Sequence, residues 1–164
     1  MANLLIVDDE LSMREFLQVF FTKSGHLVRT AASVKQAQKF CLEDSPDLVL
    51  TDLKLPEQSG MELLRWLRAE LPETQIIMMT AFATTETAIE AMRLGAYDYQ
   101  TKPFKVDELG VVTEKALEKL SLIRANKTLT QQLQQQFGLS RLTSKNHAMS
   151  EILSLIEKIA PTKI

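Results

Sequence analysis

Short runs of apolar residues alternate along the chain with longer segments whose apolar residues recur every three or four positions. Runs that are apolar throughout and stop at polar residues are typical of strands buried on both faces of a parallel sheet. The longer segments have the repeat of amphipathic helices. The apolar runs lie at residues 4–7, 27–28, 48–50, 76–79 and, more weakly, 96–99.

The helical segments have recognisable ends. Ser33 is placed to cap the second helix, the third begins after Gly60, and Gly95 is placed to end the fourth. The fourth begins near residue 84 and the fifth near residue 106. We expect these residues to face the core: Met13, Phe16, Leu17 and Phe20 in the first helix, Val34, Ala37 and Phe40 in the second, and Leu63, Leu64 and Leu67 in the third.

Five strands alternating with five helices predict an α/β protein whose parallel sheet is covered on both faces. Right-handed crossovers leave few strand orders for such a chain. The units are short, and no glycine-rich phosphate loop follows the first strand. These features favour a flavodoxin-like, doubly wound (βα)5 sheet in the order 2-1-3-4-5.

The pattern of the fifth helix has no clear stop and continues into an extended C-terminal helix. Leu122, Asn126, Leu129 and Leu133 follow one another at spacings of four, three and four. This is a short heptad seam, and an Asn at an inner position favours a two-stranded coiled coil. The alternative is a long helix whose apolar stripe covers its own domain. We expect a domain at 1–122, a helical coiled-coil linker at 123–138 and a further segment at 139–164.

Charge is distributed unevenly along the 164 residues, whose net charge is −2. Residues 1–118 hold 19 acidic and 12 basic side chains, whereas 119–150 hold five basic side chains and no acidic ones. An acidic domain suits a cation site and argues against direct contact with nucleic acid. The basic stretch is dilute and rich in glutamine, which is typical of a solvated linker.

Targeting and cysteine signals are sparse. No apolar run is long enough to cross a bilayer, and the N-terminus lacks the features of a signal peptide. Cys41 is the only cysteine, so the chain has neither an internal disulfide nor a cysteine metal site. We therefore expect a cytoplasmic protein with no membrane partner.

Polar residues of distinctive chemistry follow four of the five strands. Asp8 and Asp9 follow the first, Asp52 the third, Thr80 the fourth and Lys102 the fifth. Ligands of open α/β sheets bind at the carboxyl edge, where these residues meet. Each of them alone is as readily a turn, a cap or a solvated side chain. Three carboxylates at one point predict a hard cation, Mg²⁺ or alternatively Mn²⁺.

The same residues suit transfer of a phosphoryl group. Magnesium often takes only one or two carboxylates, which leaves an Asp52 oxygen free to attack phosphorus as a carboxylate nucleophile. Lys102 supplies a mobile positive charge for one phosphoryl oxygen, and the Thr80 hydroxyl can donate a hydrogen bond to another. Phosphoryl transfer needs mainly this positioning and charge neutralisation.

The motifs together resemble the receivers of bacterial two-component response regulators. They are Asp8-Asp9-Glu10, Asp52 within residues 51–56, Thr80-Ala81, residues 95–99 and Lys102-Pro103-Phe104. Residues 3 to 120 carry the resemblance, and within the family they most resemble receivers of the NtrC-type class of sigma-54-dependent activators. Residues 139–164 look like the approach to an AAA+ ATPase. No G-x-x-x-x-G-K-[ST] loop occurs, so we expect the chain to stop before that loop.

The resemblance implies a role for each residue. Asp52 is the expected phosphoacceptor, with Lys102, Thr80 and the Ala81 backbone N–H holding the phosphoryl group. Asp8, Asp9, Asp52 and the backbone carbonyl of Lys54 are the expected magnesium ligands, with Asp8 acting mainly through water. Thr80 and Tyr99 are the expected switch residues, and Lys102-Pro103 the expected cis peptide. Lys54 and Phe82 are placed to tune hydrolysis of the phosphoryl group.

The implied function is a phosphorylation switch rather than an enzyme. A sensor histidine kinase donates the phosphoryl group, and the face formed by the fourth helix, fifth strand and fifth helix changes dimer geometry. The homodimer forms through that face and the linker, and it controls the downstream ATPase. DNA binding is expected in a further C-terminal domain. The alternatives are a small phosphatase or phosphotransferase and a phosphorylation-independent interaction module.

Overall fold

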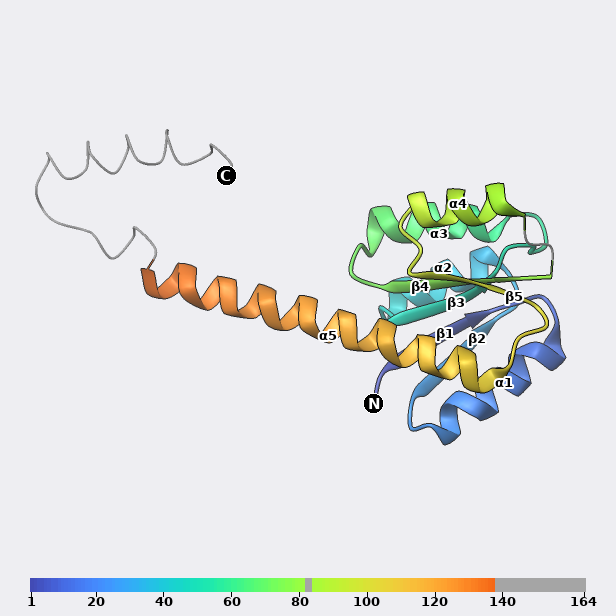
Figure 1. Cartoon of the computed structure of the whole chain (residues 1–164), viewed down its shortest axis with the longest axis horizontal. Coiled ribbons are helices and arrows are strands. Elements are labelled where there is room, and N and C mark those ends of the chain that lie inside the picture. Colours follow the sequence, from blue (N-terminus) through green and yellow to red (C-terminus); the bar gives the residue numbers. More distant parts are fainter. Residues whose placement is uncertain (82–83, 138–164) are drawn as a thin grey trace, which may run out of the picture. The chain divides into compact units, whose positions relative to one another are not determined.

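The computed structural model describes residues 1–81 and 84–137. This part contains a parallel sheet of five strands in the order β2-β1-β3-β4-β5, which confirms the predicted flavodoxin-like order (Figure 1). The strands are β1 Asn3–Val7, β2 Leu27–Ala31, β3 Leu48–Asp52, β4 Gln75–Thr80 and β5 Asp98–Thr101. The helices are α1 Leu11–Lys23, α2 Val34–Glu43, α3 Gly60–Glu70, α4 Thr85–Arg93 and α5 Val106–Phe137.

The strands differ in how well the apolar pattern predicts them. Every residue of β3 and β4 is buried, and both strands coincide with apolar runs in the sequence. The edge strands β2 and β5 contain exposed and half-buried positions. As a result β2 extends beyond its apolar start to Ala31, and β5 begins at Asp98, two residues later than the pattern predicts.

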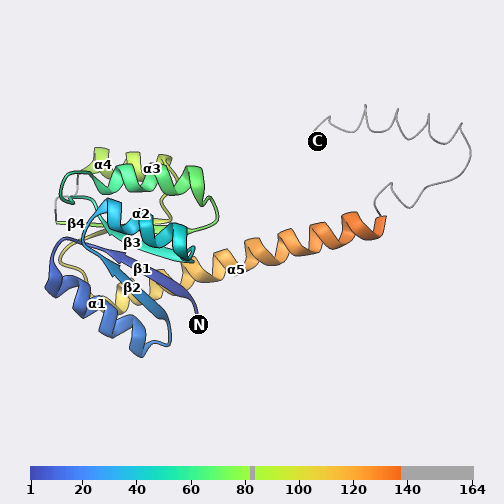
Figure 2. The same cartoon turned by 180° about the vertical axis from the view of Figure 1, so that it is seen from behind.

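Two layers of helices cover the sheet (Figures 1 and 2). Helices α2, α3 and α4 lie on one face, where their apolar residues form one core cluster with alternate strand residues such as Leu5 and Val49. Helices α1 and α5 lie on the other face and form a second cluster with strand residues such as Leu4 and Leu50. The alternation follows from the two-residue period of a strand, which sends neighbouring side chains to opposite faces.

The predicted helix faces are largely confirmed, with one correction in α1. Leu63, Leu64 and Leu67 are fully buried, Val34 and Ala37 are buried, and Phe40 packs against the same cluster. The prediction for Phe16 is wrong, because that side chain is 52% exposed. Helix α1 instead buries Leu17 and Phe21, one helical turn apart, and Met13 and Phe20 flank them.

Local hydrogen bonds cap the helices that begin near the carboxyl edge of the sheet, and a glycine ends α4 at the opposite edge. The Ser33 side chain accepts a hydrogen bond from the Gln36 N–H, which confirms the predicted cap of α2. Thr84 caps α4 through a reciprocal box with Thr87. Gly95 follows the end of α4 with φ +97°, a conformation that glycine adopts without strain.

Gly60 begins α3 in close contact with the strand that carries Asp52. Its N–H donates to the Leu53 carbonyl at 2.9 Å. A Cβ atom at this position would lie 2.0 Å from the Asp52 carbonyl oxygen, a distance that no side chain can occupy. Glycine is therefore the residue that allows α3 to begin directly beside Asp52.

The chain divides into two compact units, Met1–Leu122 and Ile123–Ile164. Helix α5 is 32 residues long, and its residues belong to both units. Its first part buries Leu109, Ala116 and Leu120. The seam leucines Leu122, Leu129 and Leu133 are 64, 59 and 55% exposed. The apolar stripe is therefore not buried against the described residues of its own chain. Residues 138 onward, including the predicted segment 139–164, lie outside the described part.

Among the helices within residues 1–81 and 84–137, none is both long and apolar enough to pass through a bilayer.

Candidate functional site

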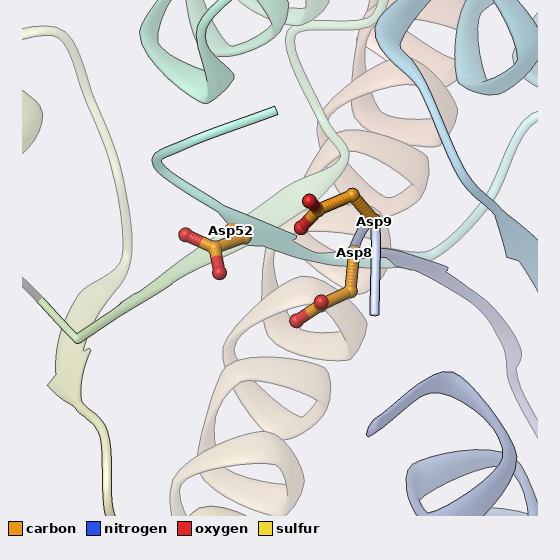
Figure 3. A group of neighbouring side chains, drawn as sticks. All are labelled: Asp8, Asp9 and Asp52. Carbon is orange, nitrogen blue, oxygen red and sulfur yellow. The ribbon is translucent and has the colours of Figure 1, made fainter. Parts of the chain in front are cut away.

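The ends of two neighbouring strands place three carboxylates at one point. Val7 of β1 is in register with Thr51 of β3, so the residues that follow meet at the carboxyl edge of the sheet. Asp8, Asp9 and Asp52 each bring a carboxylate oxygen within 4.8 Å of the other two. Figure 3 shows the three side chains gathered around a common space.

Lys102 reaches the same point from the end of β5. Its backbone N–H donates to the Thr80 carbonyl at 2.7 Å, which fixes the chain beside β4. Its Nζ donates to Asp8 Oδ2 at 2.6 Å and to Asp52 Oδ2 at 2.5 Å. The following peptide bond, Lys102–Pro103, is cis, as the resemblance implied. One ammonium group therefore links two of the three carboxylates.

Asp8 and Asp52 are held in the same way. In each, Oδ1 accepts the backbone N–H of the residue two positions later, Glu10 at 3.0 Å and Lys54 at 2.9 Å. The Oδ2 atom of each accepts from Lys102. Asp8 is fully buried and Asp52 is 8% exposed, whereas Asp9 is exposed. The site thus has two fixed carboxylates and a third that faces solvent.

Burial and charge act in opposite directions on the ionisable groups. Burial raises the pKa of Asp8, and its contacts with Lys102 and the Glu10 N–H only partly offset this. Burial by itself would lower the pKa of Lys102, but the hydrogen bonds and charges of Asp52 and Asp8 together raise it. Lys102 is therefore charged at neutral pH and compensates part of the negative charge around it.

The residues fit a hard divalent cation. Carboxylate oxygens are the ligands that Mg²⁺ prefers, and oxygens on opposite sides of one such ion are about 4.2 Å apart. The carboxylate oxygens of the three aspartates lie within 4.8 Å of one another, close enough to share one such ion, and the exposed position of Asp9 leaves the site open to water. The buried lysine neutralises only one of three carboxylates. The donor set is thus suited to Mg²⁺ or Mn²⁺.

The other predicted site residues lie around this centre. Thr80 is buried at the end of β4, and Ala81 follows it at the surface. Tyr99 is half-buried in β5, and its hydroxyl lies 3.0 Å from Thr87 Oγ1 on α4. Lys54 contributes its N–H to Asp52; the predicted ligand role of its carbonyl remains a prediction. Phe82 lies outside the described residues.

Three contacts, two of them near the site, are not predicted by the sequence pattern. Arg14 of α1 donates to backbone carbonyls of the acidic pair. Thr87 contacts Tyr99, and His26 Nε2 lies 3.0 Å from Glu114 Oε1 of α5. The last contact lies away from the site, because His26 directly precedes β2. The only signal for Arg14 is a cation in the first turn of a helix, where the helix dipole disfavours it.

Comparison with protein families agrees with this geometry. The model of the response regulator receiver domain matches residues 4–114. The chain belongs to the response regulator receiver family.

Relatives of this receiver include NtrC-type transcriptional regulators. Regulatory protein AtoC of Escherichia coli K12 is 36% identical over 158 residues, which cover 96% of this chain and 34% of AtoC. The transcriptional regulator NtrC of Proteus hauseri is 28% identical over 163 residues, 99% of this chain and 34% of that protein. The receiver chain thus spans about a third of the length of these curated relatives.

Solved structures show the same fold. The crystal structure of NtrX from Brucella abortus matches with a TM-score of 0.74 and 33% identity, over 98% of this chain and 35% of NtrX. The solution structure of the beryllofluoride-activated NtrC4 receiver domain dimer matches with a TM-score of 0.70 and 27% identity, over 73% of this chain and 99% of that one.

Proposed function

We propose that this receiver is a magnesium-dependent phosphorylation switch that accepts a phosphoryl group on Asp52 from the phosphohistidine of a sensor histidine kinase. The observation that carries the proposal is the meeting of Asp8, Asp9 and Asp52 with Lys102 at the carboxyl edge of the sheet. Membership of the receiver family supports it.

Each residue of the site has a separate role in transfer of the phosphoryl group. An Asp52 carboxylate oxygen forms the bond to phosphorus as the bond from phosphorus to the histidine nitrogen breaks, and the imidazole leaves with the electron pair. Asp8, Asp9, Asp52 and the Lys54 carbonyl would hold Mg²⁺, which when bound would supply charge neutralisation for the phosphoryl oxygens. Lys102 is already within bonding distance of Asp52 and offers its ammonium to one of those oxygens. The Thr80 hydroxyl and the Ala81 N–H are the donors for the others.

The output of the switch is a change in the face formed by α4, β5 and α5. This face includes Tyr99 and leads into the helix that bears Leu122, Asn126, Leu129 and Leu133. The exposed seam leucines support a homodimer through the linker. The NtrC4 receiver, activated by beryllofluoride, is a dimer in its solved structure. Under this proposal, the geometry of the dimer controls a sigma-54-dependent activator ATPase in the cytoplasm. The receiver itself turns over no external substrate.

The test is phosphorylation by acetyl phosphate with and without Mg²⁺, followed by the mass of the intact chain. We expect a gain of one phosphoryl group that needs both Mg²⁺ and Asp52, so the Asp52→Asn variant gains nothing. A gain of phosphoryl mass that persists in Asp52→Asn would mean that Asp52 is not the nucleophile. No gain in the wild-type protein would favour the alternative of a phosphorylation-independent interaction module.

A further inference from the structure

One arginine side chain contacts the backbone of both aspartates that follow β1. Arg14 Nη1 donates to the Asp8 carbonyl at 2.7 Å and to the Asp9 carbonyl at 2.9 Å. Arg14 lies in the first turn of α1, and its own N–H donates to the Glu10 carbonyl. A cation at a helix N-terminus opposes the helix dipole. The two carbonyl contacts compensate for that unfavourable place.

The two carbonyls define the backbone of a single residue. The Asp8 carbonyl belongs to the peptide plane that precedes the Cα atom of Asp9, and the Asp9 carbonyl belongs to the plane that follows it. Because peptide units are planar, holding both oxygens at one nitrogen atom restricts the combinations of φ and ψ that Asp9 can adopt. Those two angles determine the direction in which the Cβ atom and the carboxylate of Asp9 leave the chain.

Asp9 depends on this backbone restraint more than the other two aspartates do. Asp8 and Asp52 have both oxygens held by hydrogen bonds from Lys102 and from backbone N–H groups. Asp9 is exposed, and within residues 1–81 and 84–137 its carboxylate accepts no hydrogen bond. Its carboxylate nevertheless lies within 4.8 Å of the other two.

We propose that Arg14 is a positioning residue that fixes the Asp9 backbone so that the Asp9 carboxylate faces the metal site. The inference rests on the proposed function, because it requires that this site bind a divalent cation. Arg14 touches neither the cation nor the phosphoryl group. It acts by reducing the number of directions that an exposed carboxylate samples before the cation binds.

The charge of Arg14 has the opposite expected effect, and this makes the proposal testable by its sign. A positive charge near the site repels a cation, so removing that charge alone would tighten cation binding. Loss of the backbone restraint weakens binding instead. Outer contacts of metal ligands typically change metal affinity by about 10-fold to 100-fold, whereas one half-buried charge that is partly screened by solvent is expected to have a smaller effect.

The experiment measures Mn²⁺ binding directly, by loss of the free-ion electron paramagnetic resonance signal as protein is added. Wild type is compared with Arg14→Gln and with Arg29→Gln. The control removes the same charge from β2, where Arg29 pairs with Glu43 and lies over the ring of Phe40. Thermal unfolding of each variant checks that it is folded. We expect Kd for Mn²⁺ to rise about tenfold in Arg14→Gln and to stay within about twofold in Arg29→Gln.

A double-mutant cycle with Asp9→Asn tests whether the effect passes through Asp9. We expect Arg14→Gln to change Kd by less than about twofold in the Asp9→Asn background, since the group it positions is then absent. Tighter or unchanged binding in Arg14→Gln, or the full loss in both backgrounds, would overturn the inference. A wild-type protein that binds no Mn²⁺ would instead overturn the proposed function.

Discussion

Helices α3 and α4 lie on the same face of the sheet but are held there differently. Helix α3 buries Gly60, Met61, Leu63, Leu64 and Leu67, and its first residue touches the strand that carries Asp52. Helix α4 buries Ala91 alone, while Ile89 and Met92 are 47 and 48% exposed. One helix is part of the core and the other rests on its surface.

Polar contacts supply much of what holds α4. Thr87 contacts Tyr99 of β5, and Arg65 of α3 pairs with Glu90 at 2.6 Å. A buried leucine contributes about 2–3 kcal/mol, whereas a hydrogen bond contributes about 1 kcal/mol and an exposed ion pair less. Displacement of α4 therefore costs much less free energy than displacement of α3. In the proposed switch, this difference would let the output face move while the proposed phosphorylation site stays fixed.

The largest predicted effect compares an apolar residue of α3 with one of α4. Leu67→Ala in α3 should lower the free energy of unfolding by about 3 kcal/mol, because Leu67 is fully buried. Met92→Ala in α4 should change it by no more than about 0.5 kcal/mol. Urea denaturation of both variants measures the two values. Equal losses would mean that α4 is as much a part of the core as α3.

A second prediction uses Cys41, which belongs to the core cluster that α3 covers. Burial raises the pKa of its thiol from 9.0 to about 11, and Arg29 opposes the shift only weakly. Both states hold the proton below pH 9, and the unfolded chain loses it first as pH rises. Stability should therefore fall between pH 9 and 11, by at most about 1.4 kcal/mol per pH unit.

The measurement is urea denaturation at pH 8 and pH 10. The same pair of experiments on Cys41→Ala removes the contributions of all other titrating groups by subtraction. If wild type and variant lost the same stability between the two pH values, the thiol would not be buried as described.

The third prediction concerns the contact between Tyr99 and Thr87. The Thr87 hydroxyl donates to the Thr84 carbonyl and accepts the Thr84 N–H, so its remaining lone pair accepts from the Tyr99 hydroxyl. Tyr99→Phe removes this hydrogen bond and frees α4. We expect beryllofluoride, a phosphoryl mimic, to bind about fivefold more tightly in the presence of Mg²⁺.

Trp66 fluorescence during a beryllofluoride titration provides the measurement. Tyr97→Phe is the matched control, because Tyr97 packs in the other core cluster, with Lys119 over its ring. Weaker binding in Tyr99→Phe would show that the hydrogen bond belongs to the activated state.

The smallest predicted effect is that of the ion pair between the two helices. Arg65 and Glu90 are each 51% exposed, so Arg65→Ala should change the free energy of unfolding by about 0.5 kcal/mol or less. The change should disappear in high salt. A double-mutant cycle with Glu90→Ala isolates the pair, and a coupling well above 1 kcal/mol would make the ion pair a major attachment of α4.

The sequence predicts the fold and the centre of the site well because both depend on local patterns. Apolar runs mark the buried strands β1, β3 and β4, and parallel strands bring the residues that follow them to one edge. Asp8, Asp52 and Lys102 meet there as expected. The roles assigned to these residues remain predictions for the experiments above.

What the sequence does not predict depends on neighbours that are distant along the chain. Phe16 and Phe21 are five residues apart and therefore lie about 140° apart around α1. Spacing alone does not tell which of these two sides packs against the sheet. The edge strand β5 lacks an apolar run, since half-buried positions accept polar side chains. The contacts of Arg14 and Thr87 arise from the way loops and helix ends meet, which leaves no periodic trace.

The contact of Gly60 with Asp52 has a consequence for mutational tolerance. In a complete substitution scan scored by phosphorylation, position 60 should reject every replacement, as the proposed function predicts for position 52, although it offers no side-chain chemistry. The cause is spatial, because any Cβ atom there meets the Asp52 carbonyl. A genetic screen for unresponsive receivers would therefore recover Gly60 substitutions and give the appearance of a second catalytic position.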